Sequence, residues 1–304
     1  MKVSIIIVNW NAREYLRKCL TDVFAADSQQ GYEVLLVDNA STDGSVECVQ
    51  REYPLIEMIA NKENVGFSRA NNQGIRQSQG EYILLLNPDT KIQPHAIHLL
   101  FDFLSIHPEA GIVGPRLLNL DGSVQTSCYP FPTPARELWR LLHLDRIYPF
   151  GSYDQSEWNL TQPREVDSLQ GACLLIRREV FDQIGLLDED YFMYTEEIDF
   201  CYRAKKAGWK VVWLPTAEVI HYGGQSTRQA AASMFLELYR SKLQFFRKHH
   251  GRLAVWTYKL ILFIASLIRV ALTPFAWLEG LPKREQHLAL SRNYLHLITA
   301  LPQL

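Results

Sequence analysis

Cysteine is scarce in this sequence and does not form the patterns that bind metal or build a disulfide frame. The 304 residues include five cysteines, an odd number, and no two are spaced as Cys-x-x-Cys. A disulfide-rich secreted domain and a cysteine-based zinc site are therefore not expected. We expect reduced thiols, several of them in apolar segments, in a cytosolic protein. The five are Cys19, Cys48, Cys128, Cys173 and Cys201.

An excess of charge of one sign is also missing. The formal net charge is −2, with 21% charged and 47% hydrophobic residues. This balance gives no overall attraction to nucleic acid, so no nucleic-acid partner is expected. The apolar fraction is large enough for a sizeable core, and the length allows one large domain or two small ones.

The amino-terminal region lacks the sequence motifs of two common phosphate-binding loops, and its pattern is not that of a secretory leader. Neither G-x-G-x-x-G nor G-x-x-x-x-G-K-[ST] follows the first apolar run, so neither a dinucleotide fold nor a P-loop is supported. Lys2 precedes that run, but Asn9 and Asn11 interrupt it and no small-residue cleavage site follows. We therefore expect no signal peptide.

Apolar, β-branched runs of strand length alternate with stretches whose apolar residues recur at helical spacing. This alternation predicts a parallel sheet with right-handed crossovers, which is an α/β, Rossmann-like architecture with helices on both faces. The predicted strands are 3–8, 33–37, 55–59 and 82–86, and the predicted helices are 12–24, 68–79 and one from the turn at 41–45 to about residue 53.

Beyond residue 90 the pattern is less regular. Residues 121–165 contain five prolines and many aromatic residues, which is typical of a substrate loop or lid. The segments on either side predict helices at 94–107, 179–185 and 195–207, and strands at 111–115, 166–177 and 209–214.

Asn87-Pro88-Asp89 directly follows a strand that is predicted to be buried. In an open parallel sheet, ligands bind beyond the carboxyl ends of the strands. A carboxylate on a short proline turn at that place can hold a divalent cation against a diphosphate. Asp89 would equally well cap the helix that begins near Pro94, and this stretch alone does not decide between the two interpretations.

Polar residues follow all four strands that are predicted in the first part of the chain. Amides, carboxylates and hydroxyls at one edge of a sheet suit a base and a ribose, so a nucleotide is the most economical ligand. Each residue singly is more often a turn residue, but their joint placement favours a binding site. They are Asn9, Asn11, Asp38, Asn39, Ser41, Asp43, Asn64, Gly66, Asn87 and Asp89.

Three carboxylates crowd into the first turn of the helix that is predicted to begin at residue 195. Asp199 and Arg203 are four residues apart, a spacing that suits an ion pair, so we expect Asp199 to have a structural role. Glu196 and Glu197 lack such obvious partners. Adjacent carboxylates raise one another's pKa, which suits a general base that works near neutral pH.

His221 lies just ahead of Gly223-Gly224, after the last predicted strand. A lone histidine is more often structural or merely exposed. A Gly-Gly loop, however, lets a diphosphate approach the backbone closely, which makes His221 a candidate second ligand for a metal or a phosphate.

The C-terminal third has a different character. Residues 234–250 are amphipathic, and residues 253–281 are mostly apolar. Lys259 and Arg269 leave an uncharged run shorter than the ~18 residues expected of a spanning helix. At ~100° per residue the two cations project within ~80° of one another, which predicts one polar stripe on a helix lying in a membrane interface. A buried helix packed on the first domain or on a second subunit is the alternative.

Several segments, in the right order along residues 3–250, resemble family 2 glycosyltransferases with the GT-A fold. The likeness is greatest to bacterial rhamnosyltransferase-like members that build cell-surface polysaccharides, and it is less specific for the tail. The segments are 3–11, 37–45, 64–67, 71–74, 86–89, 170–172, 185–197 and 221–226.

The resemblance implies an inverting transfer of a sugar, rhamnose in those members, from a nucleoside-diphosphate sugar to a saccharide or lipid-linked saccharide, with Mg or Mn as cofactor. It places Asp89 on the metal. Asn87 stands where the family has the first acid of its DxD-like motif, so His221 gains importance as a second ligand. The family's Glu-Asp pair, whose second member is the base, falls on Glu196-Glu197, and the choice between these two stays open.

The remaining site residues follow from the loops described above and from the matched motifs. Gly171 and Ala172 are expected on the acceptor side, together with Trp158, although a packed loop accounts for the tryptophan equally well. The residues expected to contact the donor nucleotide are Asn9, Asn11, Asp38, Asn39, Asn64, Gly66, Asn71 and Asn87.

We therefore expect a GT-A domain over residues 1–250, with a nucleotide-binding half at 1–110 and an acceptor-binding half at 111–250. Residues 251–304 would form an apolar helical extension that associates with the membrane. The protein would then work in the cytoplasm as a peripheral protein on the inner face of the cell membrane. A homo-oligomer is left open.

Two other functions compete with this one. A catalytically inactive nucleotide-sugar-binding or scaffolding subunit is suggested by the departures at Asn87 and Glu197. A nucleotidyltransferase would share the parallel nucleotide-binding fold, but it should carry a Gly-rich loop with a catalytic Arg or Lys where Asn9-Trp10-Asn11 stands.

Overall fold

The computed structural model describes residues 3–26, 31–155, 158–225, 227–274 and 281–304. By internal contacts the chain forms two compact units. Unit 1 comprises Met1–Phe131 and Tyr153–Gln229, and unit 2 comprises Pro132–Ser152 and Ala230–Leu304. We expected the boundary between the domains at residue 250, but the second unit already begins at Ala230. Part of the proline-rich segment, Pro132–Ser152, also belongs with the C-terminal helices.

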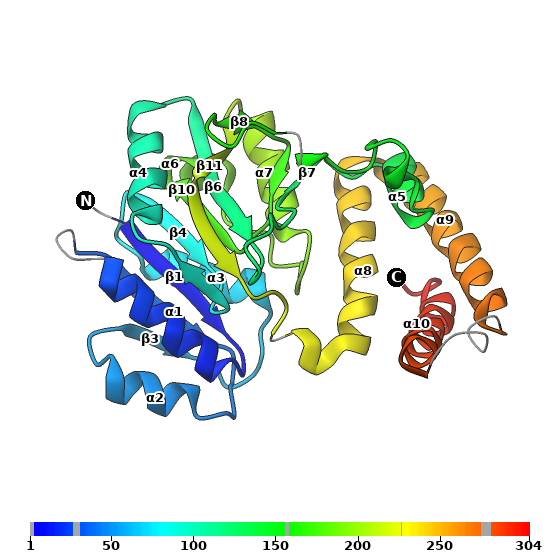
Figure 1. Ribbon diagram of the computed structural model, residues 1–304, viewed down its shortest axis with the longest axis horizontal. Helices are drawn as coiled ribbons and strands as arrows, with labels where there is room; N and C mark the ends of the chain where they lie inside the picture. Colours follow the sequence, from blue (N-terminus) through cyan, green and yellow to red (C-terminus); the bar gives the residue numbers. More distant parts are fainter. Residues whose placement is uncertain (1–2, 27–30, 156–157, 226, 275–280) are drawn as a thin grey trace. The chain divides into compact units, whose positions relative to one another are not determined.

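A mixed sheet forms the centre of unit 1 (Figure 1). In the described residues it has nine strands, in the order β3-β2-β1-β4-β10-β6-β11-β5 with β8 beside β11. The first four pair in parallel, as predicted, whereas β10 runs antiparallel between β4 and β6. The strands are β1 Val3–Asn9, β2 Glu33–Asp38, β3 Glu57–Ala60, β4 Tyr82–Leu86, β5 Thr90–Ile92, β6 Ala110–Leu118, β8 Arg164–Glu165, β10 Cys173–Arg177 and β11 Lys210–His221.

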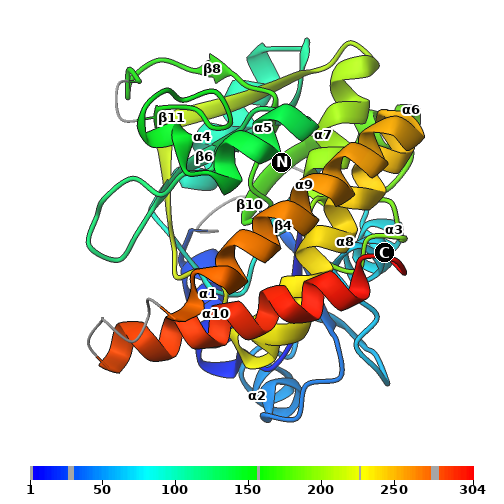
Figure 2. The ribbon, with the colours of Figure 1, turned by 90° about the vertical axis from the view of Figure 1, so that its right-hand side faces the viewer.

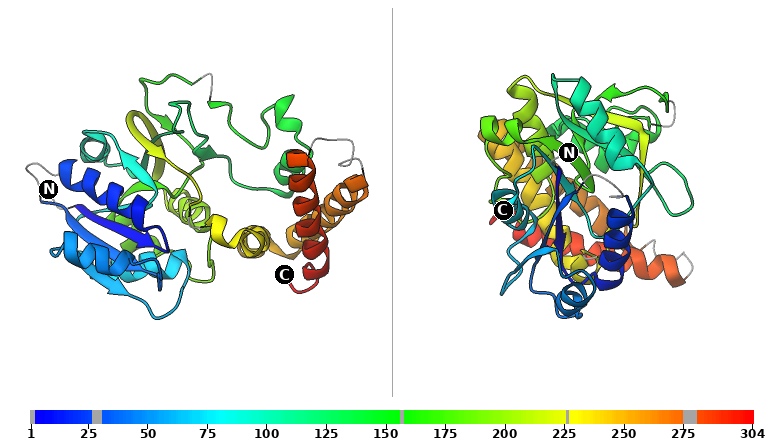
Figure 3. Two further views of the ribbon diagram at one scale, coloured as in Figure 1. Left: turned by 60° about the horizontal axis from the view of Figure 1, so that its bottom comes forward. Right: turned by 90° about the vertical axis from the view of Figure 1, so that its left-hand side faces the viewer.

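Helices cover both faces of this sheet because the inner strands are apolar on both sides. Ile5 and Ile7 of β1 pack in one cluster with α1 and α4, while Ile6 packs in a second cluster with α3, α6 and α7. Figure 3 shows α1, in dark blue, beside β1. All five cysteines are buried free thiols, as expected. The helices of unit 1 are α1 Arg13–Ala26, α2 Ser45–Glu52, α3 Phe67–Gln77, α4 Ala96–Ile106, α6 Arg178–Ile184 and α7 Glu196–Lys206.

Two predicted strands, 166–177 and 209–214, differ clearly from the structure. The strand expected at 166–177 is interrupted by a turn at Gly171-Ala172, which separates β9, Ser168–Leu169, from β10. β9 pairs instead with β7, Cys128–Tyr129, in a small second sheet. The strand expected at 209–214 continues to His221 and becomes the longest in the sheet.

Unit 2 is helical in the residues that the structure describes, and Figure 2 looks onto two of its helices, α9 and α10. α9 packs against α5, α8 and α10. α5 went unpredicted within the proline-rich segment, although Thr133 caps it and Pro134 occupies its first turn. The elements are α5 Pro134–Leu141, the 3-10 turn Leu144–Arg146, α8 Ala231–His249, α9 Gly251–Ala271 and α10 Leu281–Ala300.

A buried ion pair joins the first two of these helices. Lys242 Nζ lies 2.5 Å from Glu137 Oε2, and the hydroxyl of Tyr258 donates to the same oxygen at 3.3 Å. Burial opposes the charge on Glu137, but the attraction of Lys242 and Arg140 outweighs it and lowers the pKa of the carboxyl. The pair therefore fixes α5, α8 and α9 of unit 2 together.

The two cations that were expected to form one polar stripe on the apolar tail helix have different surroundings in the structure. Arg269 Nη2 contacts His143 Nε2 at 2.9 Å, so this cation is used inside unit 2. Lys259 lies over the ring of Trp256, with Nζ 5.6 Å from its centroid. Within the described residues α9 is long and apolar enough to cross a membrane by length and composition alone, a test that core helices of soluble proteins also pass.

Candidate active site

The chain directions in the sheet bring distant segments to one edge. β1, β2, β3, β4, β6 and β11 all end at this edge, and the antiparallel strands β5 and β10 begin there. His221 at the end of β11 pairs with Thr90 at the start of β5. The pairing of β5 with β11 therefore places His221 next to Asp89, far from it in the sequence.

Asn9 and Asp38 end neighbouring strands and are hydrogen-bonded to each other. Asn9 Nδ2 donates to Asp38 Oδ1 at 2.8 Å, and the backbone N–H of Ser41 donates to Asp38 Oδ2 at 2.8 Å. Both side chains are buried, and Asn9 Oδ1 has no hydrogen-bond partner in the described part of the chain. Asp38 thus holds the loop after β2 in place, and its contact with a nucleotide stays a prediction.

Among the other predicted donor-side amides, Asn11 and Asn39 join neighbouring loops, whereas Asn64 and Asn71 bond within their own segments. Asn11 Oδ1 accepts from Thr42 N at 2.7 Å, and Asn39 Nδ2 donates to Gly66 O at 3.1 Å. Asn64 Oδ1 accepts from Gly66 N at 3.0 Å. Asn71 donates back to Phe67 O, one turn earlier in α3.

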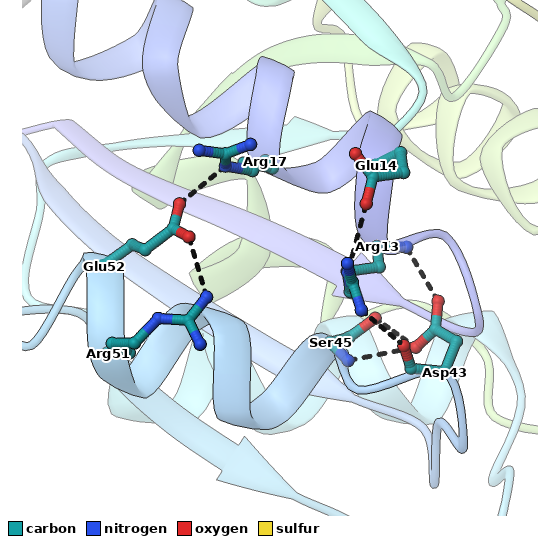
Figure 4. A network of polar contacts seen from close by, with 7 residues as sticks. All are labelled: Arg13, Glu14, Arg17, Asp43, Ser45, Arg51 and Glu52. Carbon is teal, nitrogen blue, oxygen red and sulfur yellow. Dashed lines mark hydrogen bonds and ion pairs between the residues drawn. The ribbon is translucent and has the colours of Figure 1, made fainter.

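Asp43 joins the starts of two helices, as Figure 4 shows. Its Oδ2 accepts from the backbone N–H of Arg13 at 2.8 Å, and its Oδ1 accepts from the backbone N–H of Ser45 at 3.1 Å. Because negative charge is favourable at helix N-termini, this carboxylate stabilises α1 and α2 together. We interpret Asp43 as structural.

The loop after β3 touches the segment that leads into α7. The N–H of Phe67 donates to Phe192 O at 2.7 Å, and a Cβ at Gly66 would lie only 2.7 Å from that same oxygen. The φ of Gly66 is +87°, so glycine is required here by backbone conformation as well as by space. This contact brings the acidic start of α7 toward the donor-side loops.

Asn72 positions the same segment and was not identified from the sequence. Its side-chain Nδ2 donates to Leu187 O at 2.8 Å, and its Oδ1 accepts from Leu187 N at 3.1 Å. An asparagine buried on the inner face of a helix was the available signal, since such a side chain must find polar partners.

Asp89 and His221 form a buried pair at the centre of the edge. His221 Nε2 lies 3.4 Å from Asp89 Oδ1, and the backbone N–H of Gln225 donates to Asp89 Oδ2 at 3.3 Å. Burial opposes the charge on Asp89, but His221 and the Gln225 N–H outweigh it and lower the pKa of the carboxyl. Asp89 is followed by β5 and the cap residue of α4 is His95, so the helix-cap interpretation is wrong.

Gln125 orients the His221 ring and was also missed in the sequence. Gln125 Nε2 donates to Asn119 Oδ1 at 3.0 Å and to His221 O at 3.2 Å, which turns Oε1 toward the ring. Oε1 lies 2.7 Å from His221 Nδ1, and because a carbonyl oxygen only accepts, Nδ1 carries the proton. When Nε2 also carries a proton, the cationic ring faces the Asp89 carboxylate, and this is the state that lowers the pKa of Asp89. When the ring is neutral, Nε2 presents its lone pair toward the carboxylate, an arrangement that a cation between the two groups would stabilise.

These groups fit a divalent cation. His221 Nε2 and Asn87 Oδ1 are buried and have no hydrogen-bond partner among the described residues. Together with the Asp89 carboxylate they offer nitrogen and oxygen ligands of the kind that Mn²⁺ accepts. In the described part of the chain no cluster of three or more His, Cys, Asp or Glu side chains is present. A cation here would therefore take further ligands from a substrate or from water.

Glu197 lies in the first turn of α7, directly after a stretch with a strained backbone. Tyr194 and Thr195, just before it, both have φ of +69°, which is costly for a β-branched residue. Burial raises the pKa of Glu197 to about 7, although backbone N–H groups at the helix start oppose the shift. Its Oε2 is buried and has no hydrogen-bond partner among the described residues, so its capacity to accept a hydrogen bond is unused.

The turn that interrupts the predicted strand lies against this glutamate. A Cβ built on Gly171 would be 3.5 Å from Glu197 Cβ, and the carbonyl of Ala172 accepts from Asn87 N at 2.9 Å. The turn therefore contacts both the base candidate and the metal side. Asp199 forms the predicted ion pair with Arg203 at 2.7 Å, so its role is structural.

Comparison with known proteins identifies the family of this chain. Residues 4–185 match the family model for glycosyl transferase family 2. The chain belongs to glycosyl transferase family 2. It is 33% identical over 264 residues to an N-acetylglucosaminyl-diphospho-decaprenol L-rhamnosyltransferase from Mycobacterium tuberculosis, covering 82% of this chain and 85% of the relative. It is 26% identical to rhamnosyltransferase WbbL of Escherichia coli K12, covering 77% and 88%.

Solved structures support the fold of this glycosyltransferase. The mannosyltransferase PcManGT from Pyrobaculum calidifontis, solved with GDP-Man and Mn²⁺, superposes with a TM-score of 0.59 at 17% identity, over 99% of this chain and 84% of that one. At this identity the likeness confirms the expected GT-A fold. Membership in this transferase family supports a glycosyltransferase over the inactive subunit and the nucleotidyltransferase.

Trp158 is committed to packing within the glycosyltransferase domain. Its ring meets that of Trp213 edge-on, with centroids 5.1 Å apart, and the guanidinium carbon of Arg164 lies 4.4 Å from its centroid. The packed-loop interpretation therefore accounts for the tryptophan, and its contact with an acceptor stays a prediction.

Proposed function

We propose that this glycosyltransferase transfers a sugar, most simply rhamnose, from a nucleoside-diphosphate donor to a lipid-linked saccharide, with inversion at the anomeric carbon, in cell-surface polysaccharide synthesis. The choice of sugar and acceptor is supported by the name of the mycobacterial relative, which specifies L-rhamnosyl transfer to N-acetylglucosaminyl-diphospho-decaprenol. The observation that carries the proposal is Glu197, whose Oε2 is buried without a partner and whose pKa is raised to about 7.

Glu197 is the general base. It accepts the proton of the acceptor hydroxyl, whose oxygen forms the new bond to the anomeric carbon. The bond from that carbon to the diphosphate breaks in the same step, and its electron pair leaves with the nucleoside diphosphate. A group with a pKa near 7 combines a useful ionised fraction with enough basicity at neutral pH. Glu196, the neighbour, stays the alternative base.

Asp89 and His221, with the Asn87 amide nearby, would hold Mg or Mn beside the donor diphosphate. Such a cation supplies charge neutralisation for the leaving group. Gln125 keeps His221 in the tautomer that leaves Nε2 unprotonated. The segments at this edge would receive the base and ribose. They carry Asn9, Asn11, Asp38, Asn39, Asn64, Gly66 and Asn71.

A lipid-linked acceptor implies a lipid surface, so we also place the protein at the cytoplasmic face of the membrane. The same acceptor explains why a helical unit with much exposed apolar surface accompanies the transferase domain.

The proposal is tested with purified protein, Mn²⁺, a panel of nucleoside-diphosphate sugars and N-acetylglucosaminyl-diphospho-polyprenol. We expect release of nucleoside diphosphate that depends on the acceptor, with a rhamnose donor as the preferred one, and a product whose mass has grown by one sugar. Nucleotide binding without diphosphate release for any pairing would overturn the proposal and favour an inactive binding subunit.

A further inference from the structure

α9 is largely apolar, but within unit 2 only one of its sides is covered. Its packed side faces the other helices of unit 2 and consists of buried residues at helical spacing. These residues are Val255, Tyr258, Leu262, Ala265 and Ser266. At ~100° per residue they fall within one ~100° sector of the helix.

The opposite side of α9 carries large apolar side chains that are open to solvent. Leu253 is 82% exposed, Trp256 69% and Leu260 58%. This sector is about 140° wide and runs the whole length of the helix. An apolar patch of this continuity on a soluble protein marks an interaction surface. We name it the α9 apolar face, and it comprises Leu253, Trp256, Leu260, Phe263, Ile264, Leu267 and Ile268.

The charges on α9 indicate what covers this face. The helix contains three cations and no acidic residue. Arg252 and Lys259 fall within ~20° of each other, along one border of the α9 apolar face, while Arg269 is used inside unit 2. Lys259 lies over Trp256, a pairing of cation and indole that suits the headgroup region of a bilayer.

We propose that the α9 apolar face lies in the headgroup–acyl boundary of a membrane that contains anionic lipid, with Arg252 and Lys259 contacting the headgroups. The proposal rests on the proposed function, since it brings the protein to the surface that holds a lipid-linked acceptor. The helix lies in the interface and does not cross the bilayer, because its other side is packed against α5, α8 and α10. A second copy would present the same cationic border, which disfavours self-association through this face.

Co-sedimentation of the full chain with vesicles tests the proposal. The vesicles are phosphatidylcholine alone, or phosphatidylcholine with 30% phosphatidylglycerol on the order of a bacterial anionic surface. We expect Trp256→Glu with Leu260→Glu to weaken binding to both by at least about tenfold. Arg252→Gln with Lys259→Gln should remove the preference for anionic vesicles. Each lost cation should weaken binding to these vesicles by about fivefold.

A control is Leu55→Glu, which adds a single glutamate at an exposed leucine of unit 1, outside the α9 apolar face, and should bind vesicles as the unchanged protein does. Circular dichroism and melting temperature establish that each variant is folded. Unchanged vesicle binding by the Trp256/Leu260 variant would overturn the proposal. So would a dimer in solution that this variant dissociates, or a wild-type protein that resists extraction from membranes at alkaline pH.

The two proposals fail in distinguishable ways. Transfer to a short-chain, water-soluble acceptor tests the activity without a membrane, and there the Trp256/Leu260 variant should match the unchanged protein. Transfer with no vesicle binding would contradict only the membrane face, and vesicle binding with no transfer would contradict only the proposed function.

Discussion

Replacing Glu197 by glutamine should stabilise the protein, and the gain should grow with pH. Burial raises the pKa of Glu197 from 4.5 to about 7 in the folded chain. Between these values the folded protein binds more protons than the unfolded chain, so the free energy of unfolding falls as pH rises. At about 1.4 kcal/mol for each pH unit, burial of this carboxylate costs about 3 kcal/mol at pH 8 and little at pH 4.

Glutamine has nearly the same shape and never ionises, so Glu197→Gln escapes this cost. Urea unfolding at pH 5 and pH 8 measures the free energy of unfolding of the variant and of the unchanged protein. The variant's gain in this free energy should be about 2 to 3 kcal/mol larger at pH 8 than at pH 5. Glu189→Gln is the control, because hydrogen bonds from Asn72 and Arg76 lower the pKa of Glu189. Its effect on the free energy of unfolding should therefore change with pH in the opposite direction. An advantage that is equal at both pH values, or a less stable variant at pH 8, would refute the assignment of Glu197 as a buried, unpaired carboxylate.

Three further substitutions test other parts of the account. Gln125→Leu should weaken Mn²⁺ binding, measured by calorimetry, by about 10–100-fold through loss of the acceptor that orients the histidine ligand, and wild-type affinity would exclude that role. Gly66→Ala should lower the free energy of unfolding by about 1–3 kcal/mol, since its Cβ would meet Phe192 O at 2.7 Å and its φ is positive; a neutral effect would contradict the close approach. Lys242→Met should cost about 3–5 kcal/mol in unfolding experiments because Glu137 is left buried and unpaired, whereas the double change with Glu137→Leu should recover most of it.

The strands of the first half were predictable because each is a short apolar run with one polar residue at its end. β4, Tyr82–Leu86, has the predicted limits, and β1 and β2 each extend one residue further. The contacts between side chains of the site were harder to predict from the sequence. Asp89 and His221 meet because β5 and β11 are antiparallel, and nothing local in either segment specifies that pairing.

The residues that the sequence did not reveal act through long-range contacts. Gln125 and Asn72 hold groups 96 and 115 positions away, so no periodicity in their own segments reports the partner. Likewise, α5 joins the C-terminal helices because Glu137 pairs with Lys242. The tail helix was predicted as apolar with a polar stripe, but only the structure separates its packed side from its open one.

The most direct test of the central claim is single-turnover transfer by Glu197→Gln, with donor affinity measured in parallel. The account predicts that transfer falls by at least about a hundredfold, the contribution typical of a general base, while the dissociation constant of the nucleotide sugar changes less than about threefold. Transfer at the wild-type rate would contradict the account and move the base to Glu196 or elsewhere.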